Sequence, residues 1–136
     1  MSSSDIKDVA AVIVLLIIIF VIGLFQRRPK PLNQEYFNNR WHELQKLLPD
    51  KKTWGMAVID ADKLLDEALR KRHYKGKTMG ERLVSSQRDL TDNDGVWFGH
   101  KLRNRIVHET GVKLKKRDVT EALVGFRQAL KDLGAL

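Results

Sequence analysis

Apolar residues of this chain fall into one continuous N-terminal run and then into helical stripes separated by polar connections. Residues 9–25 carry no charge, and every one except Gly23 is apolar. As a helix this run is ~25 Å long, at the lower limit of what crosses a bilayer. A buried core helix would show an amphipathic stripe, and a cleaved signal peptide would have a basic start and a small-residue cleavage site. The pattern therefore predicts a transmembrane helix over residues 9–26, after a short polar N-terminus of residues 1–8.

A basic segment with two prolines, residues 27–32, follows this run. Its cations are Arg27, Arg28 and Lys30, whereas the flank before the run has a negative balance. Positive charge gathers on the cytoplasmic side of membrane helices, so this flank is expected in the cytoplasm. The sequence thus predicts a single-pass protein of the cell (inner) membrane, with its N-terminus outside and a cytoplasmic C-terminal domain.

From residue 33 to residue 136, apolar residues recur at three- and four-residue steps, which is typical of helices that bury one face. No useful stretch alternates with period two, and the connections are short. N-capping residues mark five helix starts: Asn33, Thr53, Thr78, the run 91–95, and Asp118. The predicted fold is all-α, a single transmembrane helix followed by a four- to five-helix up-and-down bundle.

Charge and composition narrow the function only slightly. The formal net charge is +8; residues 1–30 hold four Lys or Arg and two Asp, which is +2, so residues 31–136 carry +6. Such a charge suits a phosphate-bearing partner or an anionic membrane surface without choosing between them. The chain has no cysteine, which excludes disulfides, thiol catalysis and Cys-based zinc sites. Serine hydrolase, P-loop and dinucleotide-binding motifs are also missing.

The most informative stretch is residues 99–111, a helix pattern that closes on a glycine. Positions four apart on a helix lie nearly above one another, so His100, Asn104 and His108 form one polar column flanked by Arg103. The histidine at the end of this column also has a structural explanation, because a histidine near a helix C-terminus interacts favourably with the helix dipole. His100 and His108 are ~12 Å apart along the axis, too far to chelate one metal, and no metal site is predicted.

Residues 103–108, Arg-Asn-Arg-Ile-Val-His, resemble the motif of the HEPN superfamily (higher eukaryotes and prokaryotes nucleotide-binding domains). That motif is an Arg, a polar residue, three further residues and a His. The resemblance covers these six positions and the helical context of residues 33–136. It implies a small helical bundle, usually a dimer, and in many members a metal-independent ribonuclease whose Arg and His side chains from both protomers line a shared cleft.

The resemblance makes Arg103, Asn104 and His108 the catalytic candidates. His108 would transfer a proton, Arg103 would stabilise the phosphorane, and Asn104 would orient the histidine or bind a phosphate oxygen. The nucleophile would be the 2′-hydroxyl of RNA, and the products a 2′,3′-cyclic phosphate and a 5′-hydroxyl. Four further residues are candidate substrate contacts: His100, Lys113, Lys115 and Lys116. The expected partners are RNA, a lipid bilayer through residues 9–26 and a second copy of the chain, with no cofactor.

The alternative function is a non-catalytic helical module that binds a partner or dimerises at the membrane. In that case Arg103 and His108 pair across an interface or with acidic residues such as Glu109. A third possibility is simple electrostatic binding of nucleic acid. The acidic residues of segment 60–67 are expected to form a solvated, charge-paired helix face and no metal site.

Overall fold

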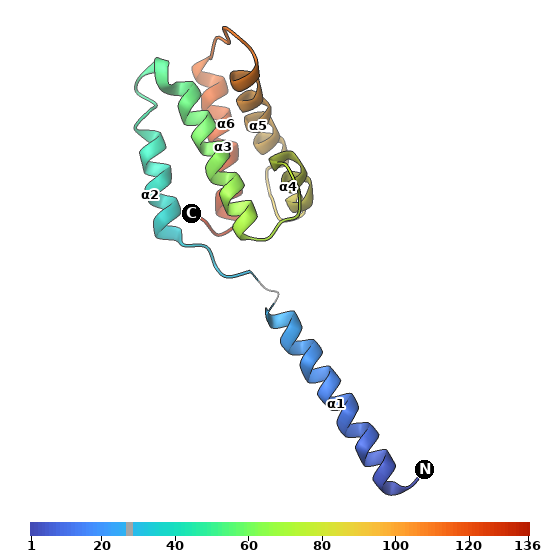
Figure 1. Ribbon diagram of the computed structural model, residues 1–136. Helices are drawn as coiled ribbons and strands as arrows, with labels where there is room; N and C mark the ends of the chain where they lie inside the picture. Colours follow the sequence, from blue (N-terminus) through green and yellow to red (C-terminus); the bar gives the residue numbers. More distant parts are fainter. Residues whose placement is uncertain (27–28) are drawn as a thin grey trace. The chain divides into compact units, whose positions relative to one another are not determined.

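The computed structural model describes residues 1–26 and 29–136 (Figure 1). All regular secondary structure in the described part is helical and none is strand, which confirms the predicted fold class. The chain divides into two compact units, Met1–Lys30 and Pro31–Leu136. Of the basic linker predicted at residues 27–32, Arg27 and Arg28 lie outside the described residues.

The first unit is built around α1 (Ser3–Gln26), none of whose residues is buried. The helix starts before the apolar run because Ser2 and Asp5 cap it: the Ser2 amide donates to Asp5 Oδ2 over 2.8 Å, and the Asp5 amide donates to Ser2 Oγ over 3.3 Å. At about 1.5 Å per residue, its 24 residues span ~36 Å. Its length and composition are sufficient to cross a membrane, and a signal sequence shares both properties.

The second unit is a helical bundle. Its elements are α2 (Gln34–Gln45), the 3₁₀ helix η1 (Lys51–Thr53), α3 (Trp54–Lys71), α4 (Met79–Ser86), α5 (Asn93–His108) and α6 (Lys116–Asp132). The central helix α3 packs against α2, α5 and α6, and α5 runs along α6 (Figure 1). The short α4 covers one end of α3. Five α-helices over residues 31–136 agree with the predicted bundle.

Three predicted capping signals act as expected. Asn33 Oδ1 accepts a hydrogen bond from the Tyr36 amide at the start of α2. Thr78 and Glu81 form a reciprocal capping box at the start of α4. Asp92 accepts from the Gly95 amide and caps α5.

Two other predicted starts differ. Thr53 precedes α3 but gives it no side-chain cap, because its hydroxyl donates to the Leu47 and Asp50 carbonyls. The predicted cap at Asp118 is wrong: α6 begins at Lys116, so Asp118 lies in its first turn, where a negative charge favours the helix dipole.

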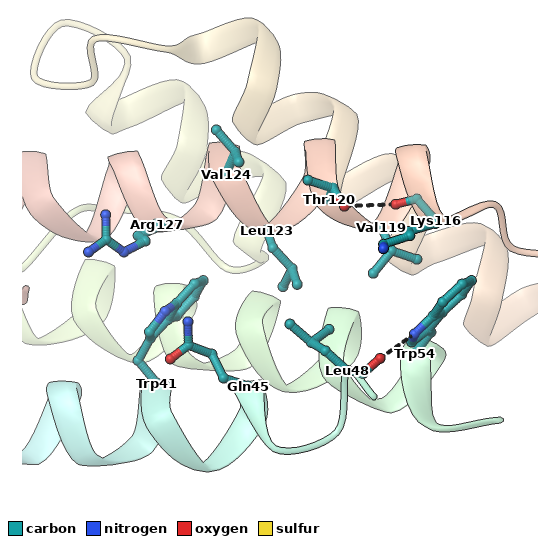
Figure 2. A pocket seen from close by; sticks show the side chains of 10 residues that line it. All are labelled: Trp41, Gln45, Leu48, Trp54, Lys116, Val119, Thr120, Leu123, Val124 and Arg127. Atoms are coloured by element: carbon teal, nitrogen blue, oxygen red, sulfur yellow. Dashed lines mark hydrogen bonds between the residues drawn. The ribbon is translucent and has the colours of Figure 1, made fainter. Parts of the chain in front are cut away.

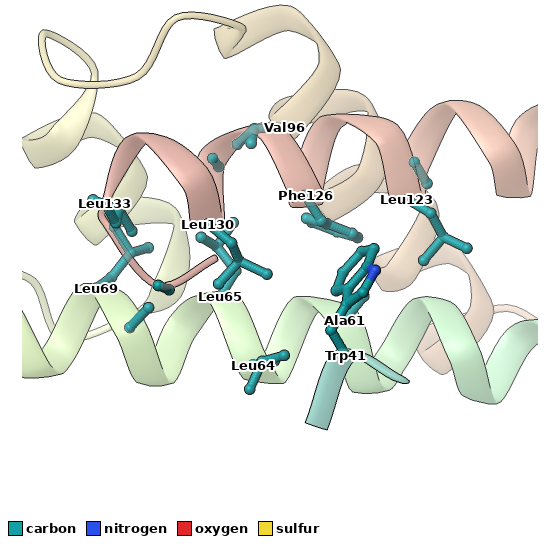
Figure 3. Packing of buried hydrophobic residues seen from close by; sticks show 14 of the residues in the cluster. Trp41, Ala61, Leu64, Leu65, Leu69, Val96, Leu123, Phe126, Leu130 and Leu133 are labelled. Atoms are coloured by element: carbon teal, nitrogen blue, oxygen red, sulfur yellow. The ribbon is translucent and has the colours of Figure 1, made fainter. Parts of the chain in front are cut away.

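The core lies mainly between α3 and α6. In Figure 3, Leu65 and Leu69 of α3 face Leu130 and Phe126 of α6, and the exposed fraction of all four is zero. Burying such side chains contributes roughly 1.5–3 kcal/mol each.

Two glycines set how closely α5 approaches α6. A Cβ at Gly99 would lie 2.7 Å from Phe126 Cζ, and one at Gly125 would lie 2.4 Å from the Gly95 carbonyl. Real side chains do not tolerate these separations, so the two helices can meet this closely only with glycine at these positions. The contact places Gly99 against α6, and the next residue, His100, lies against Asp62 of α3.

Candidate functional site

A hollow of about 450 Å³ lies where α3, the start of α4 and α5 meet. Three polar residues of the informative stretch line it, namely His100, Arg103 and Asn104 from α5. The remaining lining residues are Asp62, Lys63 and Asp66 from α3, and Thr78, Met79 and Gly80 at the α4 start. Three helices thus bring polar groups from distant parts of the sequence to one place.

Asp62 is the anchor of this hollow, and only 3% of its surface is exposed. Its Oδ1 lies 2.8 Å from Nδ1 of His100, which is itself 9% exposed. A buried carboxylate needs such partners, because removing an ion from water without compensation is costly. Since a carboxylate only accepts hydrogen bonds, His100 donates to Asp62 through Nδ1.

Arg103 and Asn104 extend this arrangement. Arg103 Nε lies 3.4 Å from Asp62 Oδ2, within ion-pair range but without hydrogen-bond geometry. Arg103 Nη1 donates to Asn104 Oδ1 over 3.0 Å, and Asn104 Nδ2 lies 3.5 Å from His100 Nε2. The amide of Asn104 therefore lies between the guanidinium of Arg103 and the imidazole of His100, and both of these groups also contact the buried carboxylate of Asp62.

A partly buried ion pair between Arg82 and Asp66 holds the edge of the hollow. Arg82 donates to both carboxylate oxygens of Asp66, over 2.7 and 3.0 Å, and to the Gly76 carbonyl over 2.7 Å. These bonds tie the loop before α4 to α3, and the loop ends at Thr78 on the rim. Gly80 leaves space over the imidazole, since a Cβ there would lie 3.9 Å from His100 Nε2.

The acidic face predicted on α3 is half right. Charge pairing is confirmed, because Asp66 also pairs with Arg70 and Glu67 pairs with Lys71. The prediction of a solvated face is wrong for Asp62. Its position one turn after Val58 and before Leu65, both fully buried, is the sequence signal that it faces the interior.

His108 lies apart from the hollow. It is the last residue of α5, exposed, and is not among the residues that line the hollow. Within residues 1–26 and 29–136 its side chain makes no hydrogen bond or ion pair. Glu109, proposed as a possible partner, pairs with Arg105 over 3.6 Å. Within one chain, Arg103 lines the hollow and His108 does not.

The three lysines predicted as substrate contacts lie outside the hollow, whereas His100 lines it. Lys113 and Lys115 are exposed in the connection between α5 and α6. Lys116 starts α6 and lines a different, apolar groove. The hollow contains one lysine instead, Lys63 of α3.

In the described part of the chain, no three His, Asp or Glu side chains are grouped so that they could hold a metal ion. What the hollow offers is a positioned imidazole nitrogen, guanidinium donors and an amide, groups suited to binding an anion and moving a proton. Comparisons of the chain with protein-family models, with curated proteins and with solved structures find no match.

Proposed function

We propose that residues 31–136 form a metal-independent endoribonuclease similar to the HEPN ribonucleases, acting at the polar face of α5. The observation that carries this proposal is the convergence of His100, Arg103 and Asn104 on one hollow. The motif residues Arg103 and Asn104 both line it, so an RNA phosphate entering there meets cationic and amide donors together.

The proposed reaction uses the nucleophile that RNA itself contains. The 2′-hydroxyl attacks the adjacent phosphorus while an imidazole accepts its proton, and the leaving 5′-oxygen takes up a proton. Guanidinium donors of Arg103 stabilise the charge that develops on the phosphorane oxygens. The products are a 2′,3′-cyclic phosphate and a 5′-hydroxyl.

The geometry adds His100 to His108 as a candidate for proton transfer. Asp62 holds the His100 ring by Nδ1, which leaves Nε2, 3.5 Å from the Asn104 amide, as the nitrogen that would accept the proton. The carboxylate would stabilise the resulting imidazolium. The two histidines of one chain are ~12 Å apart along α5, too far to serve both oxygens of one phosphorus. In a homodimer, the α5 face of a second copy would supply the other imidazole. His108 is exposed at the end of α5 and would reach the hollow of the partner subunit.

We also propose that α1 anchors the bundle in the inner membrane, with the N-terminus outside. The length and apolar character of α1 support this, together with the Lys and Arg residues that follow it in the sequence. The bundle then faces the cytoplasm, the compartment that holds RNA.

The test is cleavage of single-stranded RNA by the full chain in lipid nanodiscs with excess chelator. His100→Ala and His108→Ala are each expected to reduce the rate by about 10²–10⁴-fold, the usual value of general acid–base catalysis. The matched control is His42→Ala, since His42 is exposed on α2 and does not line the hollow. Equal rates in all three variants would contradict the proposal.

One observation favours a non-catalytic interaction module as the second candidate. Arg103 is paired with a buried carboxylate, so part of its charge is already compensated inside the fold. In that case the cluster joins α3 to α5, and the variants lower stability without any RNA cleavage. Absence of cleavage in the wild type, with destabilised Arg103→Ala, would favour this candidate.

A further inference from the structure

A groove lies between α2 and α6 and shares no lining residue with the hollow (Figure 2). Its volume is about 230 Å³ and its walls are mainly apolar. In Figure 2, Trp41 and Leu48 come from the α2 side, and Leu123 points toward them from α6. The groove exists because α2 and α6 each pack against α3 and leave the space between them open.

A hydrogen bond holds one end of the groove in shape, and an apolar side chain is exposed at its rim. Trp54 Nε1 donates to the Leu48 carbonyl over 2.8 Å, which holds one end in shape. Val124 at the rim is 59% exposed. Trp41 is only 5% exposed, and its buried Nε1 has no acceptor among the described residues. An occupant that brings an apolar face would cover this surface.

Two cations stand at opposite ends of the groove, Lys116 and Arg127 (Figure 2). They lie eleven residues apart on one face of α6, about 16 Å along its axis. Neither side chain forms an ion pair within residues 1–26 and 29–136, and the groove lining includes no acidic residue. The groove is therefore apolar in the middle and electropositive at both ends.

We propose that this groove binds an amphipathic helix of a partner protein, with acidic residues about 16 Å apart and bulky apolar residues between them. An apolar cavity of about 150 Å³ accepts benzene, so this groove has room for one or two large side chains. A single-chain amphiphile such as a fatty acid has one charged end and matches only one of the two cations. This inference is independent of the ribonuclease proposal, because it uses other residues.

The test selects binders from a phage-displayed library of peptides of about 14 residues, long enough as a helix to span both cations. The target is the full chain in nanodiscs, with empty nanodiscs used to remove lipid binders. Selected peptides are expected to share apolar residues at helical spacing with Asp or Glu near both ends. Val124→Arg should weaken their binding about tenfold or more, because it places a charge at the apolar rim of the groove. The matched control is Val84→Arg, which changes an equally exposed valine of α4 outside the groove.

Charge reversal tests the acidic requirement directly. Arg127→Glu should weaken the selected peptide several-fold, and replacing the facing peptide carboxylate by lysine should restore binding. The proposal is overturned if selected peptides lack carboxylates or bind Val124→Arg as well as wild type. It is also overturned if decanoate, but no peptide, protects the groove tryptophans from quenching, or if Val124→Arg turns a dimer into a monomer.

Discussion

Replacement of Asp62 is the change whose effect the structure determines most clearly. Asp62→Ala leaves His100 Nδ1 without its acceptor and leaves Arg103 Nε facing an empty buried space. An orphaned buried polar group costs about 1–3 kcal/mol, and breaking a buried ion pair costs about 3–5 kcal/mol. Because the Arg103 side chain is 26% exposed and regains water, we expect a loss near the lower value, about 3 kcal/mol.

Asp62→Asn separates charge from shape. The amide oxygen still accepts a hydrogen bond from His100. Arg103, however, loses the negative charge with which it pairs. The expected loss is smaller, about 1–2 kcal/mol.

The assay is urea unfolding of the full chain in detergent micelles, followed by tryptophan fluorescence. With a slope of about 2 kcal/mol per molar urea, a loss of about 3 kcal/mol lowers the midpoint by about 1.5 M. The control is Asp60→Ala on the same helix, whose carboxylate forms no ion pair in the described residues. A midpoint for Asp62→Ala equal to that of Asp60→Ala would refute the buried-anchor interpretation.

Two further predictions concern packing and pH. Gly99→Ala should lower the free energy of unfolding by about 1–3 kcal/mol, since its Cβ would overlap Phe126. The control is Gly80→Ala, whose Cβ would have no neighbour closer than 3.8 Å and which should remain as stable as wild type. Equal melting points for the two variants would be inconsistent with the Gly99–Phe126 contact. Burial raises the pKa of Asp132, but hydrogen bonds from Thr91 and a neighbouring amide outweigh it and lower the pKa below its usual 3.8. Because the carboxyl of Asp132 has a lower pKa in the folded state, its charged form stabilises the fold above pH ~4, and this stabilisation is lost as the pH falls through the folded-state pKa. Asp132→Asn should therefore destabilise the fold by less than about 1 kcal/mol at pH 7, and by less still at pH 2–3. Denaturant midpoints at both pH values measure this difference, and a penalty that grows on acidification would count against it.

Local sequence signals were sufficient for most of the fold. Helical periodicity and capping chemistry act over a few residues, so Asn33, Thr78 and Asp92 marked helix starts correctly. Other features depend on contacts between elements. The turn after α4 is held by Asn93 at the start of α5, whose amide donates to the Gln87 and Leu90 carbonyls. Those two bonds leave no local pattern in the sequence.

The candidate site was predicted only in part, for the same reason. His100, Arg103 and Asn104 share a helix face, so their proximity followed from spacing alone. Their dependence on Asp62, far away in sequence, follows from how α3 packs against α5. The position of His108 outside the hollow likewise depends on where the neighbouring helices end.

The most direct test of the central claim compares Arg103 with Arg105, two arginines on α5 of which only Arg103 lines the hollow. RNA cleavage by the full chain in chelator is measured for Arg103→Ala and Arg105→Ala, with product ends identified. We expect 2′,3′-cyclic phosphate ends from the wild type and from Arg105→Ala, and a loss of at least about 10²-fold in Arg103→Ala. Equal cleavage by the two variants, or a wild type that leaves RNA intact, would contradict it.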